Sequence, residues 1–421
     1  MHTSQHFPGL VDLREKTVSP LVYIDRDVYQ AEQELIFAKS WLYVGHESQL
    51  PNDADFIVAS MGEVSVLVWR RAEGRIGVYL NSCPHRGMRV CREESGRART
   101  MVCPYHGWSF DQKGALRGVP NFEDSYAGLL DKSKWGLIPV ARVETYRGLI
   151  FACFDPDVVP LVDYLGHAKW YLDAALNGTA NGLKALPGVH RWQVDANWKF
   201  GAENAAGDNA HAAVVHASVL PMFDPLEPGA KPFDHPFNHE VKMGNGHGWL
   251  ALNQPPERDP VVAAHVAKVR EEAAGRLTPK QLEQYGKFYV GTIFPNLSFF
   301  FAGTPTIRVW QPRGVNRMEV WSWTFAEGDP SAEVVEAQRR NMTTSFSASG
   351  LVEQEDGLMW SSCQRELESG VVRRRHVLNY AQGANNTYTE PDRPGVLGKN
   401  PTEIGIFGFY ERWHADMGGT Q

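Results

Sequence analysis

Two short segments of the chain each place one cysteine beside one histidine. The first is Cys83-Pro84-His85-Arg86-Gly87 and the second is Cys103-Pro104-Tyr105-His106-Gly107-Trp108, with seventeen residues between His85 and Cys103. Thiolates and imidazoles are side chains that bind iron and zinc in proteins. The candidate ligands of this first metal site are Cys83, His85, Cys103 and His106.

The ligand set matches a Rieske [2Fe–2S] centre better than a structural zinc site. In a Rieske centre one iron keeps two cysteines and the other takes two histidines. A Cys2His2 zinc site usually takes both cysteines from one segment and both histidines from another, whereas here each segment supplies one of each. Gly87 and Gly107 suit loops whose backbone comes close to a cluster and whose N–H groups reach its sulfides. The sequence therefore predicts a [2Fe–2S] cluster.

A second pair of histidines, His211 and His216, lies far along the chain. Two histidines and one carboxylate bind Fe(II) in non-haem oxygenases and leave positions open for O2. Five residues rotate an ideal helix by about 140° beyond a full turn, so a regular helix would not direct both rings at one ion. We therefore expect a distortion or a break between them. The alternative is that these are two unrelated histidines on a helix.

The segment that contains the first candidate site is predicted to be rich in strands. From Phe56 to Phe154 the sequence consists of short β-rich runs separated by Gly and Asp turns, which predicts a small all-β domain. Its clearest strands are Val64–Trp69, Ile76–Leu80 and Leu149–Ala152. Before it, Asp27–Trp41 has apolar residues at helical spacing and predicts one amphipathic helix.

After Pro156 the chain has mixed character. The sequence predicts helices at Val162–Leu176, Ala202–Val219 and Ser331–Leu367, and strands at Trp192–Lys199, Leu297–Phe301, Thr306–Trp310 and Met318–Phe325. This order is typical of an antiparallel sheet flanked by helices. The expected fold class is therefore α+β.

Composition excludes several classes of function. A net charge of -7 gives no basic surface for nucleic acid, and no segment approaches the ~18 apolar residues of a membrane span. Met1–Leu13 lacks the apolar core of a signal peptide, so we expect a cytoplasmic protein. Five cysteines in 421 residues are too few for a disulfide framework.

Together these motifs resemble those of the Rieske ring-hydroxylating oxygenase α subunits. The resemblance covers nearly the whole chain, including Phe294-Pro295-Asn296 and the terminal Phe409-Tyr410-Glu411-Arg412-Trp413. It implies an all-β Rieske domain and a catalytic domain with a helix-flanked antiparallel sheet. The expected limits are 1–42 for a helical segment that packs on the catalytic domain, 43–155 for the Rieske domain and 156–421 for the catalytic domain.

The resemblance also implies roles for individual acidic residues. Asp356 aligns with the family's third iron ligand, with Glu355 and Glu353 as competing candidates and a solvated helix face as the alternative. Asp208 is expected to link His106 of a neighbouring subunit to His211, unless it only complements a helix dipole. Asn204 lies on the same predicted helix and, like Asp208, is not assigned to the iron.

The implied function is that of a terminal oxygenase with a [2Fe–2S] cluster, mononuclear Fe(II) and O2 as co-substrate. Electrons would come from a ferredoxin and an NAD(P)H-dependent reductase, because the sequence shows no nicotinamide or flavin site. The expected assembly is a homotrimer or an α3β3 complex with a small β subunit. The expected reaction is cis-dihydroxylation of an apolar aromatic or polycyclic substrate, and Ala205, Ala206, Ala210, Ala212 and Ala213 would leave room for it. The alternatives are a Rieske monooxygenase or O- or N-demethylase, and an electron-transfer protein without oxygenase activity.

Overall fold

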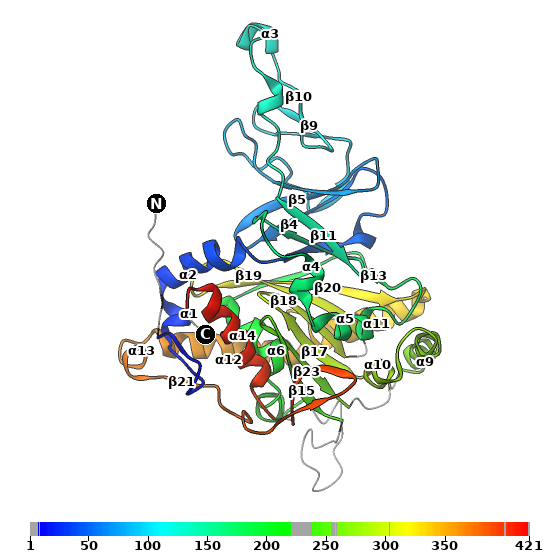
Figure 1. Ribbon diagram of the computed structural model, residues 1–421. Coiled ribbons are helices and arrows are strands. Elements are labelled where there is room, and N and C mark those ends of the chain that lie inside the picture. The colour runs from blue at the N-terminus through cyan, green and yellow to red at the C-terminus, as the bar shows by residue number, and fades with distance from the viewer. Residues whose placement is uncertain are drawn as a thin grey trace. The chain divides into compact units, whose positions relative to one another are not determined.

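The computed structural model describes residues 7, 9–219, 237–253, 257, 259–302, 304–399 and 401–419. The chain forms two compact units (Figure 1). The small unit is Phe37–Leu161, and the large unit contains the described residues before and after it.

The small unit is built from three antiparallel sheets. Their strand orders are β6-β5-β4-β7, β10-β9-β8 and β11-β12-β3. The strands are β3 Leu42–His46, β4 Asp55–Met61, β5 Val64–Arg70, β6 Ile76–Leu80, β7 Ser95–Arg97, β8 Thr100–Val102, β9 Ser109–Asp111, β10 Leu116–Gly118, β11 Arg142–Tyr146 and β12 Leu149–Cys153. The unit also contains the short α-helix α3 Phe122–Tyr126 and two 3-10 turns at Glu47–Gln49 and Lys132–Lys134. The predicted strands at β5, β6 and β12 are confirmed.

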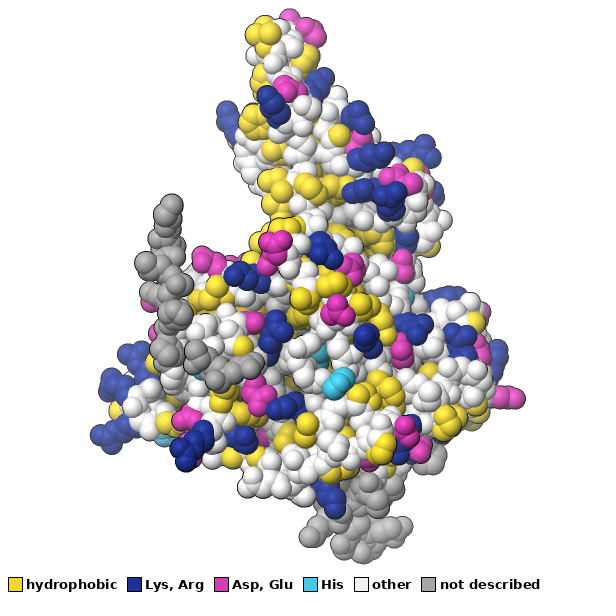
Figure 2. All heavy atoms as spheres, in the orientation of Figure 1, with side chains coloured by type: hydrophobic (Ala, Val, Ile, Leu, Met, Phe, Trp, Pro, Cys, Tyr) yellow, Lys and Arg dark blue, Asp and Glu magenta, His cyan; other side chains and the backbone are white. Residues whose placement is uncertain are grey.

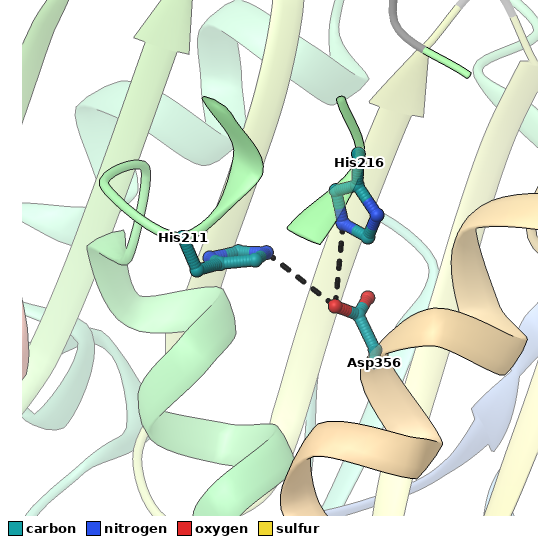
Figure 3. A group of neighbouring side chains, drawn as sticks. All are labelled: His211, His216 and Asp356. Carbon is teal, nitrogen blue, oxygen red and sulfur yellow. Dashed lines mark ion pairs between the residues drawn. The ribbon is translucent and has the colours of Figure 1, made fainter. Parts of the chain in front are cut away.

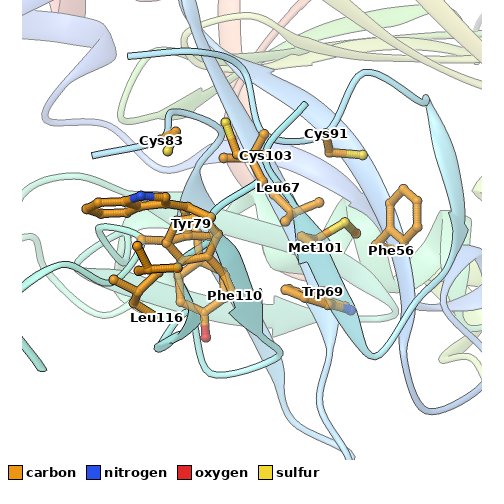
Figure 4. Close-up of a cluster of buried hydrophobic side chains, with 14 residues drawn as sticks. Phe56, Leu67, Trp69, Tyr79, Cys83, Cys91, Met101, Cys103, Phe110 and Leu116 are labelled. Carbon is orange, nitrogen blue, oxygen red and sulfur yellow. The ribbon is translucent and has the colours of Figure 1, made fainter. Parts of the chain in front are cut away.

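A single buried cluster supports the metal-ligand segments of the small unit. Leu67, Trp69 and Phe110 are completely buried in it, and both Cys83 and Cys103 belong to it (Figure 4). Because protein interiors are close-packed, the buried side chains of β5 and β9 fix the position of the two cysteine loops.

The large unit is organised around a ten-stranded antiparallel sheet. Its order is β13-β20-β19-β18-β17-β16-β15-β23-β22, and β14 also pairs with β20. The strands are β13 Leu183–Ala185, β14 His190–Val194, β15 His239–Gly244, β16 His247–Leu252, β17 Phe288–Ile293, β18 Leu297–Ala302, β19 Thr304–Pro312, β20 Met318–Glu327, β22 Thr387–Glu390 and β23 Arg393–Lys399. A small sheet joins β1 Val11–Asp12, β2 Thr17–Val18 and β21 Leu378–Asn379.

Helices flank this sheet. They are α1 Leu21–Ile24, α2 Arg26–Glu32, α4 Leu161–Leu165, α5 Ala168–Leu176, α6 Trp198–Gly207, α7 Ala212–Val215, α9 Pro260–Ala274, α10 Pro279–Gln284, α11 Ala332–Ser345, α12 Leu351–Glu368, α13 Val372–Arg375 and α14 Ile404–Asp416. The α+β fold class is confirmed, as are the strands predicted at β18, β19 and β20.

Several predicted boundaries are wrong. The strand predicted at Trp192–Lys199 ends at Val194, because the Asn197 side chain accepts a hydrogen bond from the Lys199 backbone N–H and begins α6. The predicted helix Ser331–Leu367 is two helices, since α11 ends at Ser345 and α12 begins after Gly350. A Cβ atom at Gly350 would lie 2.3 Å from the Ser345 carbonyl oxygen, so only glycine allows this close turn.

The predicted helix Asp27–Trp41 also ends early. The α-helical part stops at Glu32, a π-helical turn follows at Gln33–Phe37, and Leu42 begins a strand.

Helix α6 lies directly against the sheet because small residues face it. A Cβ at Gly201 would meet the Trp310 ring on β19, and a Cβ at Gly248 on β16 would lie 2.2 Å from the Ala206 carbonyl oxygen. The contacts of α6 with β16, β17 and α14 therefore depend on glycine and alanine at the interface.

A buried ion pair ties the start of α6 to the N-terminal segment. The Lys199 Nζ lies 2.6 Å from Glu32 Oε1, and both side chains are fully buried. The indole N–H groups of Trp198 and Trp413 also donate to the Glu32 carboxylate. Three elements of the large unit, α2, α6 and α14, thus meet at one carboxylate whose hydrogen bonds are well satisfied.

No helix among the described residues is long and apolar enough to cross a membrane. On the face seen in Figure 2, basic and acidic side chains are interspersed.

Removing Lys199 tests the buried ion pair. Lys199→Ala leaves Glu32 buried with an uncompensated charge, which costs about 3–5 kcal/mol. Lys184→Ala removes an ion pair with Asp329 that is largely exposed and should have little effect. Calorimetry of both variants should show a large fall in melting temperature for the first only. Equal melting temperatures would contradict the structural role of the pair.

Candidate metal centres

The two cysteine–histidine segments of the small unit form loops with the same backbone hydrogen bonds. Cys83 N–H donates to the Met88 carbonyl at 2.8 Å, and Cys103 N–H donates to the Trp108 carbonyl at 2.8 Å. Gly87 and Gly107 donate back to the carbonyls of the two cysteines, at 2.8 and 3.0 Å. Both glycines have positive φ, +72° and +71°, which other residues rarely adopt. Each segment therefore folds into the same tight turn.

The side chains of these loops converge. Cys83 and Cys103 are each 2% exposed, and the rings of His85 and His106 lie 4.5 Å apart between centroids at an angle of 74°. The His85 ring stacks on Trp108, and its Nδ1 atom is buried without a hydrogen-bond partner. An unpaired buried nitrogen is costly unless a ligand takes it up. Two cysteines and two histidines in this arrangement fit a [2Fe–2S] cluster.

Burial also affects the ionisation of the loop cysteines. All five cysteines of the chain are free thiols, and burial raises the pKa of Cys83 to about 11. The Cys103 side chain lies within hydrogen-bonding distance and raises this pKa further. Because a bound metal deprotonates its thiol ligands, positive charge at this site would reverse the cost of ionising Cys83.

The large unit brings together His211, His216 and Asp356. The His211 Nε2 atom lies 3.4 Å from Asp356 Oδ1, and the His216 Nε2 atom lies 3.2 Å from the same oxygen (Figure 3). One potential ligand atom from each residue lies within 4.8 Å of the others. Two imidazoles and one carboxylate can hold one metal ion and leave other coordination positions open.

The helix break does not fall between the two histidines as predicted. Helix α6 ends at Gly207, and His211 and His216 flank the single turn α7. The predicted helix Ala202–Val219 is therefore interrupted before His211. The distortion predicted between the histidines is also absent, because His211 has helical φ and ψ and the His216 N–H donates to the Ala212 carbonyl at 3.1 Å. Both rings still reach the Asp356 carboxylate on α12.

The outer nitrogens of both rings have partners. The His216 Nδ1 atom lies 2.8 Å from Glu355 Oε2, and the Ser218 hydroxyl donates to Glu355 Oε1 at 2.7 Å. The His211 Nδ1 atom lies 3.3 Å from Asn204 Nδ2 and 3.3 Å from Asp208 Oδ1. Such partners set the ring orientation and leave the Nε2 atoms facing Asp356.

The surroundings of this group favour a positive charge on it. Burial lowers the pKa of His211, but hydrogen bonds with Asp208 and Asp356 raise it more, to about 10. Burial raises the pKa of Asp356, and the two histidines lower it more, to below its ordinary range. A site that stabilises a cation in this way suits a metal ion, which would displace the proton.

The two rival carboxylates are engaged elsewhere. Glu353 is buried in an ion pair with Arg308 on β19, and Glu355 contacts the outer nitrogen of His216. The geometry therefore favours Asp356 over both. The Glu355–Ser218 pair was not identified from the sequence, because only the fold brings residues 218 and 355 together.

The alanines near the histidines differ in their surroundings. Ala205 and Ala206 are fully buried, and Ala206 packs closely against Gly248 and Gly405. Ala206 therefore serves the packing of α6 and not the space expected for a substrate. Ala210, Ala212 and Ala213 are half-buried.

Comparisons with known proteins match both units. The Rieske [2Fe-2S] domain family matches residues 40–145, and the family of the ring hydroxylating alpha subunit (catalytic domain) matches residues 161–418. The chain belongs to the Rieske ring-hydroxylating oxygenase α subunits. It is therefore a terminal oxygenase with a [2Fe–2S] cluster and a mononuclear iron that uses O2.

Individual relatives of this α subunit are similar over nearly their whole length. The biphenyl 2,3-dioxygenase subunit alpha of Rhodococcus jostii is 39% identical over 96% of this chain and 89% of the relative. The N,N-dimethyl phenylurea N-demethylase subunit alpha of Sphingobium sp. is 32% identical over 93% and 89%. The structure of naphthalene 1,2-dioxygenase from Rhodococcus sp. bound to indole has a TM-score of 0.86 and 34% identity, and the match covers 95% of this chain and 94% of that one.

Replacing cysteines tests the first centre of this α subunit. Cys83→Ser should remove the cluster, seen as loss of visible absorbance and acid-labile sulfide. Cys91→Ser is the control, because Cys91 is buried in the same cluster of side chains but outside the two loops. If Cys91→Ser lost the cluster and Cys83→Ser kept it, the ligand assignment would be wrong.

Replacing carboxylates on α12 tests the second centre. Asp356→Ala should lose the mononuclear iron and keep the cluster spectrum, because the two candidate ligand sets share no residue. Glu355→Gln should bind iron about 10–100-fold more weakly, since it changes only the partner of a ligating ring. Glu366→Ala, at an exposed position of the same helix, is the control. Metal analysis of the three variants would refute Asp356 as a ligand if its variant kept full iron.

Proposed function

We propose that this α subunit adds both atoms of O2 to an apolar aromatic or polycyclic substrate, giving a cis-dihydrodiol. The convergence of His211, His216 and Asp356 carries this proposal, because two histidines and one carboxylate leave positions open for O2 beside a substrate. The relatives named for biphenyl and naphthalene dioxygenation support the substrate class.

The ligand roles are part of the proposal. His211, His216 and Asp356 would hold the iron, and Cys83, His85, Cys103 and His106 would hold the cluster. When bound, the cluster supplies single electrons and the iron activates O2. The chain's own side chains set this up: Glu355 accepts the Nδ1 proton of His216, which leaves Nε2 unprotonated toward the iron position.

Asp208 and Asn204 have supporting roles in this proposal. Both contact the outer nitrogen of His211 and therefore fix its orientation without binding the iron. In a homotrimer or α3β3 assembly, Asp208 would also bond to His106 of the partner subunit and give electrons a hydrogen-bonded path between centres.

Ring-hydroxylating α subunits work with electron-transfer proteins and often with a β subunit. We propose a ferredoxin and an NAD(P)H-dependent reductase as electron donors here, and a cytoplasmic location in which NAD(P)H is available. We also propose a small β subunit and the domain limits 1–42, 43–155 and 156–421. The contacts of Glu32 on α2 with α6 and α14 support the assignment of the N-terminal helices to the catalytic domain.

A second candidate reaction is oxidative N-demethylation. The relative named as an N,N-dimethyl phenylurea N-demethylase subunit favours it, because that protein shares 32% identity over 93% of this chain. The same metal sites would serve both reactions.

Oxygen labelling distinguishes the two reactions. The assembled enzyme with ferredoxin and reductase should convert biphenyl or naphthalene under 18O2 to a vicinal cis-diol with two labelled oxygens. Demethylation would instead give formaldehyde from a dimethyl phenylurea. Product with a single labelled oxygen from the aromatic compounds, or turnover of the phenylurea alone, would refute dioxygenation. Asp356→Ala is the control without iron.

A further inference from the structure

Three tyrosine hydroxyls surround one buried carboxylate beside the iron-ligand cluster. Tyr23 on α1 donates to Glu203 Oε2 at 2.7 Å, and Tyr410 on α14 donates to the same oxygen. The hydroxyl of Tyr380, after β21, lies 3.4 Å from both carboxylate oxygens. The Tyr23 hydroxyl also bonds to those of Tyr380 and Tyr410. Three distant segments of the chain therefore converge on Glu203 of α6.

This cluster lies next to the candidate iron centre. Glu203 precedes Asn204 on α6, and Asn204 Nδ2 lies 3.3 Å from the outer nitrogen of His211. One turn earlier on α6, Trp198 and Lys199 contact Glu32, as does Trp413, one turn beyond Tyr410. Phenols and indoles, the most readily oxidised side chains besides thiols, thus adjoin the centre on this side.

A purely structural glutamate would be satisfied by any donors, including backbone N–H groups. Here the donors are phenols, whose oxidation requires a proton acceptor at hydrogen-bonding distance. Glu203 provides that acceptor. Burial raises the pKa of its carboxyl to about 8, against the effect of the hydrogen bonds from Tyr410 and Tyr23, so the carboxylate that accepts the proton is the main form above this pH.

The burial of the three phenols gives the cluster an inner and an outer side. Tyr23 and Tyr410 are completely buried, whereas Tyr380 is half-buried. An oxidising equivalent that reached the inner phenols could therefore leave through Tyr380 to a small reductant in solution.

We propose that Tyr23, Tyr380, Tyr410 and Glu203 form a redox-active site that reduces an oxidised mononuclear iron centre when no substrate consumes its oxidising power. One tyrosine gives one electron to the oxidised iron, and its hydroxyl proton passes to the Glu203 carboxylate. The products are a neutral tyrosyl radical and a carboxylic acid. A one-electron donor such as ascorbate then reduces the radical, and Glu203 returns the proton to the phenolate oxygen.

The experiment uses hydrogen peroxide as the oxidant and the assembled enzyme with both metal centres, without substrate. Samples frozen after mixing are measured by electron paramagnetic resonance, with and without ring-deuterated tyrosine. The wild type should give a radical signal that narrows on deuteration. Glu203→Gln should lose the radical signal, and Tyr23→Phe, Tyr410→Phe and Tyr380→Phe should each give a weaker signal. These three variants should also lose enzyme activity after fewer molecules of peroxide are consumed than the wild type does.

Tyr171→Phe is the matched control, because Tyr171 is buried in the same unit but donates to the Pro394 backbone carbonyl and not to a carboxylate. It should keep the full signal. Ascorbate should quench the wild-type radical faster than that of Tyr380→Phe. If the variants of the fully buried tyrosines do not fold, Tyr380→Phe still tests the proposal, because a substitution at this half-buried position disturbs the core less.

Three results would each overturn the proposal. They are no tyrosyl signal in iron-loaded wild type, equal signals in Tyr171→Phe and the cluster variants, and a signal of wild-type size in iron-free Asp356→Ala. The proposal rests on an iron bound at His211, His216 and Asp356, so iron content and product formation are measured on the same samples. Wild type without iron or product contradicts the proposed function, whereas wild type with both and no radical contradicts only this inference.

Discussion

Helix α6 must stop at Gly207, and the arrangement of the iron-ligand cluster depends on that stop. After Gly207 the chain leaves α6, and the single turn α7 carries His211 and His216 at its two ends. From these positions both rings reach the Asp356 carboxylate on α12. The same break leaves Asp208 at the end of α6, where its carboxylate faces the outer nitrogen of His211.

The position of α6 is set by packing on one side and by buried charge on the other. Glycines and Ala206 allow the helix to approach β16 and α14 closely. At its start, Lys199 pairs with Glu32, and one turn later Glu203 accepts hydrogen bonds from tyrosines. Buried charges are tolerated only with such partners, so these contacts restrict α6 to one position. The precision of the metal site thus depends on residues that bind no metal.

The two candidate metal centres position their candidate ligands by different means. In the small unit, short loops with positive-φ glycines present the cysteines from a β framework, and the same backbone hydrogen bonds close each turn. In the large unit, side-chain contacts orient the histidines. Glu355 with Ser218 orients His216, and Asn204 with Asp208 orients His211. The first design needs only local sequence. The second requires contacts across about 140 residues of chain.

The sequence by itself determined what depends on local chemistry. The spacing of Cys83, His85, Cys103 and His106 predicted a cluster site because these candidate ligands lie in two short loops, and short β-rich runs located β5, β12, β18 and β20. The resemblance to a family singled out Asp356, but its rivals Glu353 and Glu355 stayed open, because three carboxylates on one helix look alike in sequence. Only the tertiary structure separated them, by burying Glu353 against Arg308 and placing Glu355 behind His216. It also decided where α6 ends and which tyrosines meet Glu203, since these contacts join residues up to 207 positions apart, and no local pattern records them.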